Sequence, residues 1–455
     1  MFFVLSAIFA AVFFTAFTYT GGDEDKPIPI PASPQRTGDA AKGYIYLTTG
    51  DFIKSGFPYD FFTFTNKDSK NYLNRDGKAA NVGQGYNVVM NADSMAIVIP
   101  TCLQCHAQVF DGKLCIGLGN SMADFSNFSE KARKLSILKM WQTTSPKKYA
   151  AVKSLLRSLM VVNPLMETEV QGVNSADRLA ALLVAHRDPQ TLVWSNEALL
   201  EIPDAVIPTD VPAWWLLKKK NAMFYNGFGR GDFGKFLMLS NILTVTDSAE
   251  AREVDSHFGD VLAYINSIQS PKYPHPVNKE LAAQGQLVFT NNCQGCHGTY
   301  GEHGSYPNLL IPGNVIKTDD ALFKANQQNS KFIDWFNKSW FSQGANPARI
   351  VPSEGYVAPP LDGVWITAPY LHNGSVPTLE AVLNSKIRPK YWSRDFDNPV
   401  YDYEHVGWQY KNEDAPGGKK VYNTTLLGYG NAGHYFGDEL SDKERKAVIE
   451  YLKTL

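Results

Sequence analysis

The sequence predicts a mainly α-helical protein made of two successive domains, each built around one copy of a five-residue motif. Three observations support this prediction. Cys-x-x-Cys-His occurs twice, at residues 102–106 and 293–297. Apolar residues recur with helical spacing in several stretches, and no strand pattern of any length stands out. A proline-rich run at residues 271–276 lies between the two copies and marks a domain boundary.

The repeated motif is the attachment signature of c-type haem. Each pair of thiols bonds to one porphyrin, and the histidine that follows binds the iron as its proximal ligand. With 5 Cys and 9 His in 455 residues, chance gives roughly 0.001 matches. The sequence therefore predicts two covalently bound haem c groups. The attachment residues are Cys102, Cys105, Cys293 and Cys296, and the proximal ligands are His106 and His297.

Two other kinds of site use paired cysteines. Two C-x-x-C pairs can bind zinc together, but such pairs are usually about twenty residues apart, and these are much further separated. A redox dithiol needs one pair, without a histidine after each. Haem attachment remains the interpretation that uses both copies.

Charge and the N-terminal residues restrict the partners and the location. The formal net charge of −2 argues against a nucleic-acid-binding protein. Residues 1–20 are apolar and carry no charge, which predicts a signal peptide or a membrane anchor, and both alternatives stay open. We therefore expect a periplasmic or extracellular protein, with anchoring to the outer face of the cytoplasmic membrane as one form.

The remaining pattern gives the domain organisation. Residues 21–42 are rich in Pro, Gly and charge and predict a linker, followed by an N-terminal haem domain at 43–270 and a C-terminal haem domain at 275–455. Helical periodicity predicts helices at Ser129–Gln142, Lys147–Val161, Ser175–His186, Asp255–Ile268, Asn278–Asn291 and from Ser441 to the C-terminus.

The second domain resembles the cytochrome c fold, in which the first and last helices cross. Ser441 and Glu444 have the spacing of a capping box at the start of the last helix. Gly285 and Phe289 share one face of the first helix, and we expect them to meet Tyr451 at the crossing.

A longer motif carries a wider resemblance. Residues 358–379 read APPLDGVWITAPYLHNGSVPTL, which is similar to the "APY-x-H-(D/N)-G-S" segment of the bacterial di-haem cytochrome c peroxidase superfamily. The flanking "GYVAPPLDGVW" resembles the rubber oxygenase-like branch more closely. The resemblance covers roughly residues 45–455. It implies two cytochrome c-like haem domains with long loops, and calcium between them as a possible further cofactor.

The resemblance implies different iron coordination in the two domains. In the family, the sixth ligand of the C-terminal haem lies just before the last helix, where this chain has Gly433-His434 and no Met after Met238. His434 is therefore the predicted second axial ligand opposite His297, with His372 as the alternative. The N-terminal haem has Leu118 where many peroxidases have a capping histidine. Its iron is predicted to be open, with Met122 as the alternative ligand.

Further roles are implied by the same alignment of motifs. Tyr225 stands where peroxidases have a tryptophan between the haems, and Trp214 and Trp215 are the other candidates for an inter-haem relay. Leu118, Arg230 and Asp232 are the predicted residues of the distal pocket. Peroxidases have a Gln where this chain has Lys235, and no distal Glu can be placed, which departs from ordinary peroxidase chemistry.

These expectations combine into a function. We expect an exported di-haem c-type oxidoreductase, in which the C-terminal haem transfers electrons and the N-terminal haem reacts with peroxide or dioxygen, as a peroxidase or an oxygenase. Its expected partner is a small redox protein that donates or accepts electrons. The alternative is a periplasmic electron-transfer cytochrome that catalyses no reaction.

Overall fold

A computed structural model of the chain describes residues 25–67 and 69–455. The predicted signal peptide or anchor at residues 1–20 and the first residues of the predicted linker lie outside the described residues. Within the described ranges, no helix is both long enough and apolar enough to cross a bilayer.

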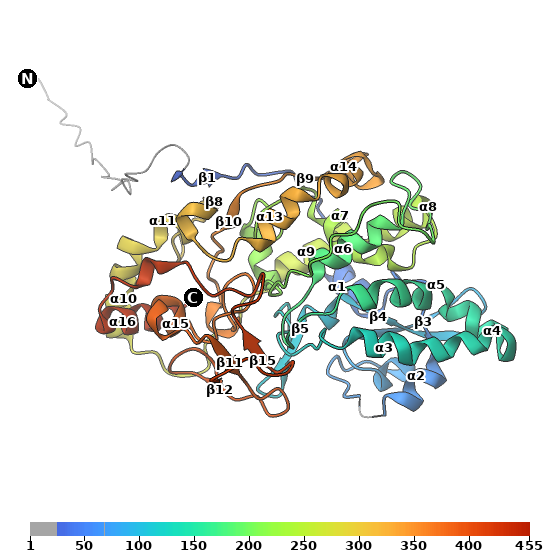
Figure 1. The fold of residues 1–455 in the computed structure, drawn as a ribbon, viewed down its shortest axis with the longest axis horizontal. Coiled ribbons are helices and arrows are strands. Elements are labelled where there is room, and N and C mark those ends of the chain that lie inside the picture. The colour runs from blue at the N-terminus through green and yellow to red at the C-terminus, as the bar shows by residue number, and fades with distance from the viewer. Residues whose placement is uncertain (1–24, 68) are drawn as a thin grey trace, which may run out of the picture.

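The prediction of a mainly α fold is wrong. Of the described residues, 40% are helical and 13% are in strands, and the strands form several small sheets (Figure 1). The α-helices are α1 Ala40–Thr49, α2 Tyr59–Thr65, α3 Phe128–Leu135, α4 Trp141–Thr144, α5 Pro146–Val162, α6 Ala176–Ala185, α7 Phe233–Met238, α8 Ser248–Asp255, α9 Phe258–Ser267, α10 Lys279–Asn292, α11 Gln294–His297, α12 Gly313–Ile316, α13 Ala321–Gln328, α14 Ser330–Lys338, α15 Leu379–Leu383 and α16 Asp442–Leu452. Short 3₁₀ helices that matter below are η3 Cys102–Gln104, η4 Ser136–Met140, η6 Trp214–Lys219 and η7 Leu239–Leu243.

The strands are short and form two- and three-stranded antiparallel sheets. Their orders are β2-β4-β3, β1-β8-β10, β14-β11-β15, β5-β6, β7-β9 and β12-β13. The strands are β1 Ile28–Pro29, β2 Phe57–Pro58, β3 Tyr86–Met90, β4 Ala96–Pro100, β5 Ala107–Phe110, β6 Lys113–Ile116, β7 Gly229–Gly231, β8 Leu309–Pro312, β9 Ala348–Ile350, β10 Gly355–Val357, β11 Tyr391–Ser393, β12 Tyr401–Asp402, β13 Gly407–Trp408, β14 Lys411–Asn412 and β15 Val421–Asn423.

The length and pairing of the strands explain why the strands were missed and a mainly α fold was predicted. A strand of two to five residues is too short for its alternation to be recognised. Many partners are also remote in the sequence, because β8 pairs with both β1 and β10, and β7 pairs with β9. Such pairing is decided by tertiary contacts rather than by local sequence.

Most of the predicted helices are present, with one interruption. The periodicity at 129–142 predicts one continuous helix, but the structure has α3, η4 and α4 there. The 3₁₀ turn η4 carries Leu138, which is buried in a cluster with Val152 and Leu156 of α5. Packing of Leu138 against α5 accompanies the tighter turn.

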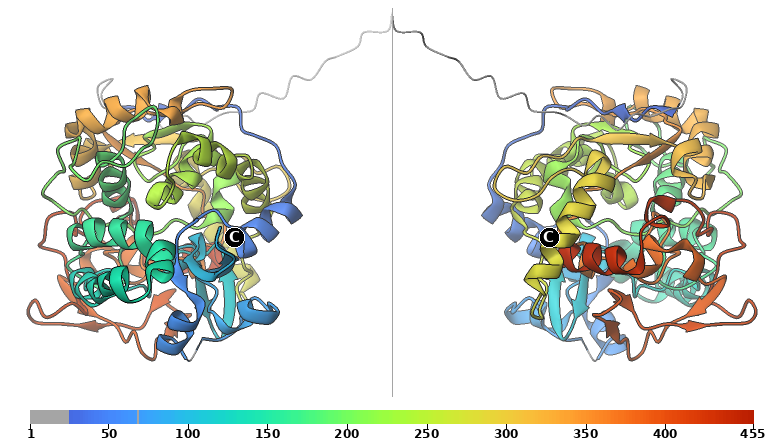
Figure 2. Two further views of the ribbon diagram at one scale, coloured as in Figure 1. Left: turned by 90° about the vertical axis from the view of Figure 1, so that its right-hand side faces the viewer. Right: turned by 90° about the vertical axis from the view of Figure 1, so that its left-hand side faces the viewer.

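The first and last helices of the second half cross as expected. The ring of Phe289 in α10 lies 5.2 Å from that of Tyr451 in α16, centroid to centroid, and the two helices lie against each other in Figure 2. The capping box of Ser441 and Glu444 is present. Gly285 makes the close approach possible, because a Cβ atom there would lie 1.8 Å from the carbonyl oxygen of Ala447.

The two halves of the chain are interlocked. Phe332, Trp335 and Phe336 of α14 belong to the same buried cluster as Leu183 of α6 and Phe258 of α9. Helix α14 therefore packs on the N-terminal half, although it follows the second motif in sequence. The predicted boundary between 270 and 275 remains a prediction about the sequence, and the packing of the two halves crosses it.

We expect Gly285→Ala to lower the stability of the protein. An alanine inside a helix normally stabilises by about 0.5–1 kcal/mol relative to glycine, but here the added methyl group meets the backbone of α16, and overpacking costs about 1–3 kcal/mol. Denaturant unfolding would measure this. Gly418→Ala is the matched control, because a Cβ at Gly418 meets nothing within 4 Å. A Gly285→Ala protein as stable as wild type would contradict the close crossing.

Candidate haem-binding site

The two C-x-x-C-H motifs fold into the same local turn. In each, the backbone N–H of the histidine donates to the carbonyl of the first cysteine, with N···O distances of 3.0 Å for His106 and 3.0 Å for His297. The N–H of the second cysteine donates to the same carbonyl at 3.2 Å in both motifs. Two stretches of chain far apart in the sequence thus share the backbone hydrogen bonds of one turn.

Different elements position the two turns. The first turn follows strand β4 and begins with Thr101, whose hydroxyl accepts a hydrogen bond from the N–H of Leu103 at the start of η3. The hairpin β5–β6 follows it directly. Asp111 and Gly112 at the hairpin turn both have positive φ, as in a two-residue type I′ turn. The second turn ends α10, with Cys293 as the C-cap residue, and continues as α11.

One cavity of about 1060 Å³ connects the two turns. Its lining includes all four motif cysteines, both motif histidines, His372 and His434. The volume is at the upper end of the roughly 300–1,000 Å³ range of small-molecule pockets. All five cysteines of the chain are free thiols, and burial raises the pKa of Cys102 and Cys293 to about 12. The four motif thiols are therefore protonated and in no disulfide, and their residues line a shared, mostly apolar cavity, which fits covalent haem attachment.

Two histidines face each other in the second half. The ring centroids of His297 and His434 are 6.1 Å apart. A metal–imidazole nitrogen bond is about 2.0 Å, and a ring centroid lies roughly 1.2 Å behind its nitrogen, so one metal ion between two imidazoles needs centroids about 6.4 Å apart. The alternative ligand, His372, instead stacks on Tyr356 with centroids 4.1 Å apart. The geometry therefore supports His434 as the partner of His297.

Pro359 and Arg388 fix the positions of His297 and His434. Nδ1 of His297 lies 2.8 Å from the carbonyl oxygen of Pro359, which leaves Nε2 available for a metal. The guanidinium of Arg388 donates to the carbonyls of Asn431 and Gly433, at 2.7 Å each. The loop that carries His434 is thus fixed by Arg388.

The imidazoles are neutral, as iron ligation requires. Burial lowers the pKa of His434 to about 3, and the charge of Arg388 and the nearby His297 act in the same direction. Burial also lowers the pKa of His297, against the Pro359 carbonyl. For His106, burial lowers the pKa to about 3, against the carbonyl of Pro212. A neutral imidazole keeps one lone pair for a metal.

At the first site, no second imidazole from the part of the chain that the structure describes faces His106. Among the described residues, the aromatic ring in contact with His106 is that of Trp214, stacked with centroids 4.5 Å apart. Apolar side chains of α5, α6 and η7 line the cavity at this end, in the same buried cluster as Leu103 of the first motif. The lining residues that belong to this cluster or pack against it include Val162, Leu179, Leu183, Leu239 and Leu243.

The predicted relay residues are close to the two sites. Trp214 and Tyr225 line the cavity. Trp215 does not line it, but its indole N–H donates to the carbonyl of Asp362 at 2.8 Å. Asp362 lies three residues after Pro359, so η6 connects the stacked ring at His106 with the segment that orients His297.

The residues predicted for the distal pocket lie elsewhere. Leu118 is buried in a cluster with Ala213 and Trp215, and Met122 packs against that cluster; neither lines the cavity. Asp232 is the N-cap of α7 and forms an ion pair with Arg36. These side chains are used for packing and capping.

Arg230 also lies away from the cavity. It is part of β7, where it is paired with Arg349 of β9, and it is absent from the cavity lining. The resemblance of motifs assigned Leu118, Arg230 and Asp232 to one distal pocket. In the structure, none of the three lines the cavity.

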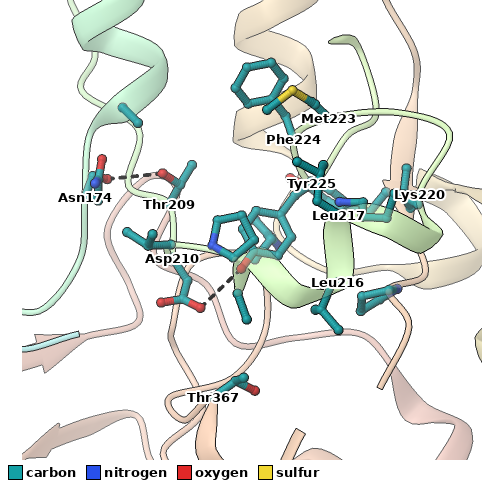
Figure 3. A pocket seen from close by; sticks show the side chains of 18 of the residues that line it. Asn174, Thr209, Asp210, Leu216, Leu217, Lys220, Met223, Phe224, Tyr225 and Thr367 are labelled. Atoms are coloured by element: carbon teal, nitrogen blue, oxygen red, sulfur yellow. Dashed lines mark hydrogen bonds between the residues drawn. The ribbon is translucent and has the colours of Figure 1, made fainter. Parts of the chain in front are cut away.

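Sequence reasoning missed the carboxylate of Asp210, which lines the cavity together with Asp177 and Asp362. The hydroxyl of Tyr225 donates to Oδ2 of Asp210 at 3.2 Å, and both side chains line the cavity (Figure 3). Burial raises the pKa of Asp210 to about 7, against hydrogen bonds from the backbone of Val211 and from Tyr225. A single Asp in a Pro-rich loop carries no motif, and only the fold brings it to Tyr225.

The predicted calcium remains untested. Among residues 25–67 and 69–455, no group of three or more His, Cys, Asp or Glu side chains lies close enough to bind a metal ion together.

Comparison with known proteins supports the haem assignment for the second half. A family model described as "RoxA-like, cytochrome c-like" matches residues 355–393, the region that orients His297 and fixes the loop of His434. The uncharacterized protein y4iM of Sinorhizobium fredii is 27% identical over 306 residues, which cover 59% of the chain and 69% of that protein. The uncharacterized protein y4iJ of the same organism is 30% identical over 256 residues, 41% of the chain and 41% of that protein. Residues 355–393 are thus similar to RoxA-like cytochromes, and this similarity implies haem c binding and an oxidoreductase-type function.

Proposed function

We propose that the protein is an exported c-type cytochrome oxidoreductase with two haems of different function. The C-terminal haem, held between His297 and His434, transfers electrons. The N-terminal haem, held at His106, reacts with peroxide or dioxygen. The observation that carries the proposal is the asymmetry of the two ends of the cavity, because His297 faces a second imidazole at 6.1 Å and His106 contacts an indole ring instead.

The asymmetry leads to different chemistry at the two ends. An iron with two imidazole ligands has no position for a small molecule and changes only its oxidation state. At the other end, leucine and valine side chains exclude water and offer no lone pair. Bound haem supplies redox and dioxygen chemistry, and the chain determines which of its two haems is accessible.

The partner and location follow from the same features. A redox protein outside the cytoplasm would donate or accept electrons at the C-terminal haem. The apolar residues 1–20 support export, and covalent haem attachment to C-x-x-C-H suits an exported protein. Consumption of a reduced cytochrome separates a peroxidase from an oxygenase. The competing proposal, a carrier without catalysis, requires a second axial ligand on the N-terminal iron.

Each motif should hold one haem. Replacing Cys293 and Cys296 together by Ala should halve the haem content per chain in a pyridine haemochrome assay, because a porphyrin without its two thioether bonds is lost on denaturation. Cys115→Ala is the control, since Cys115 lies in β6 outside both motifs. Unchanged haem in the double variant would contradict attachment at this motif.

His434 should determine the spin state of the C-terminal haem. His434→Ala removes one of two facing imidazoles, and EPR should show one low-spin ferric signal converted to high spin. His372→Ala should keep both signals unchanged in number, because His372 stacks on Tyr356. The reverse result would assign the ligand to His372.

Carbon monoxide tests the accessible N-terminal iron. Added to the reduced protein, it should shift about one of the two haems, because only one end of the cavity has two facing imidazoles. Met122→Ala should bind the same amount, since Met122 does not line the cavity.

Two further methionines, Met166 and Met223, do line the cavity. A sharp rise of carbon monoxide binding in Met166→Ala or Met223→Ala would show a thioether on the iron. If, in addition, the wild-type protein binds no carbon monoxide, the result would favour the electron carrier without catalysis.

A further inference from the structure

Lys220 is a charged side chain on the wall of the cavity. It is the C-cap residue of η6, and its N–H donates to the carbonyl of Leu217 at 3.0 Å. The backbone becomes extended at this residue, with φ of −90° and ψ of 144°. Lys220 lines the cavity, and Figure 3 shows its side chain beside those of Leu217 and Tyr225. A cation is therefore present in a lining that is mostly apolar.

The backbone on both sides of Lys220 is fixed by hydrogen bonds. The carbonyl of Lys219 accepts one from the side-chain amide of Asn308 at 3.0 Å. The N–H of Asn221 donates to Oδ1 of the same asparagine at 2.6 Å, and its side-chain amide donates to the carbonyl of Ile30 at 2.8 Å. These contacts connect the stretch to the N-terminal segment and to the second half of the chain, and they hold Lys220 at the cavity wall.

The two preceding lysines have partners, whereas Lys220 has none. Nζ of Lys218 donates to the carbonyl of Ile268 at 2.8 Å. Nζ of Lys219 lies 2.7 Å from each carboxylate oxygen of Asp362. The ammonium of Lys220 forms no hydrogen bond or ion pair with a residue that the structure describes. Its counter-ion is therefore missing from the described part of the chain.

An anion would remove the cost of burying this ammonium. Burial lowers the pKa of Lys220 to about 8, and no described carboxylate acts against that shift. Most of the side chain is still protonated at pH 7. An ion enclosed in an apolar environment destabilises the protein unless it is paired. The anion comes either from another residue of the lining or from a molecule that fills the cavity.

The acidic residues of the described lining are already engaged. They are Asp177, Asp210 and Asp362. Their partners are Asn326 at 3.1 Å, Tyr225 at 3.2 Å and Lys219 at 2.7 Å, in the same order. None of these carboxylates pairs with Lys220. The anion that Lys220 requires must therefore belong to the bound molecule.

Haem has the chemistry that this wall requires. Its ring is apolar except at one edge, which carries propionate groups that are ionised near neutral pH. The apolar side chains of the cavity suit the ring, and an ammonium suits a carboxylate at the edge. The lysines and arginines among the described lining residues are Lys26 and Lys220. The cavity thus offers few cations to the propionates of two haems.

We propose that the ammonium of Lys220 binds a propionate carboxylate of a haem in this cavity. The ion pair joins two charges that would otherwise be buried alone. Its positive charge favours the reduced iron, so Lys220 raises the reduction potential of that haem. The inference rests on the part of the proposed function that places haem in the cavity, and it is independent of which haem reacts with peroxide or dioxygen.

A spectroelectrochemical titration of the haem-loaded protein tests the ion pair. In Lys220→Met, one midpoint potential should shift to a lower value and the other should stay, because an unpaired propionate stabilises ferric iron. Lys220→Arg should restore the wild-type potential, because a guanidinium also binds a carboxylate. Lys218→Met is the matched control: it removes the same charge from the same helix, and Lys218 is exposed and does not line the cavity.

A free carboxylate is the other source of an anion for Lys220. Calorimetric titration with octanoate distinguishes the two sources. If a propionate occupies Lys220, octanoate should give the same heat with the wild type and with Lys220→Met. Binding of octanoate by the wild type that is lost in Lys220→Met, together with unchanged midpoint potentials, would overturn the propionate assignment.

Haem content separates this inference from the proposed function. Two haems per chain, with both midpoint potentials unchanged in Lys220→Met, would contradict the ion pair and leave the function standing. One haem per chain in the wild type would contradict the function, whereas a lower potential of that haem in Lys220→Met would still support the ion pair and an unchanged one would overturn it. If Lys220→Met does not fold, Lys220→Gln, which is also neutral, replaces it in each measurement.

Discussion

The distance between His297 and His434 is the constraint on which the second half of the molecule depends. Two neutral imidazoles in an apolar interior gain nothing from facing each other, because each presents a lone pair and a desolvated nitrogen. A shared metal ion removes that penalty. The helix crossing of α10 and α16, the carbonyl of Pro359 and the guanidinium of Arg388 all serve to hold this pair at one spacing.

The interlocked strands explain how one cavity can serve two motifs that lie far apart in the sequence. Strand β8 pairs with β1 and β10, and β7 pairs with β9, so segments from both halves form common sheets. The same connections place Tyr225 beside β10 and bring α14 into the N-terminal core. A cavity wall made from both halves keeps the two motifs in a fixed relation, as the proposed electron transfer between two haems would require.

The apolar lining has a second effect, because it sets the charge of every titratable group that it encloses. Burial keeps the histidines neutral and the thiols protonated, and it raises the pKa of Asp210 to about 7. The family match at residues 355–393 falls on the part of the chain that orients the second site. The first site is lined by α5, α6 and η7, which lie outside the matched residues. The family match therefore does not determine the reaction at this end of the cavity.

The sequence by itself predicted haem c, and the tertiary structure decided which residues line the cavity. The two motifs predicted haem c, and the spacing of Ser441 and Glu444 predicted the capping box, because each depends on residues within about one turn of each other. The crossing of the first and last helices was expected from the resemblance to the cytochrome c fold. The strands were missed because their partners are remote, and Leu118, Arg230 and Asp232 were assigned to a pocket they do not line. Asp210 meets Tyr225 only through the fold. A spacing of a few residues fixes local geometry, whereas the lining of a cavity is set by long-range packing that no single segment encodes.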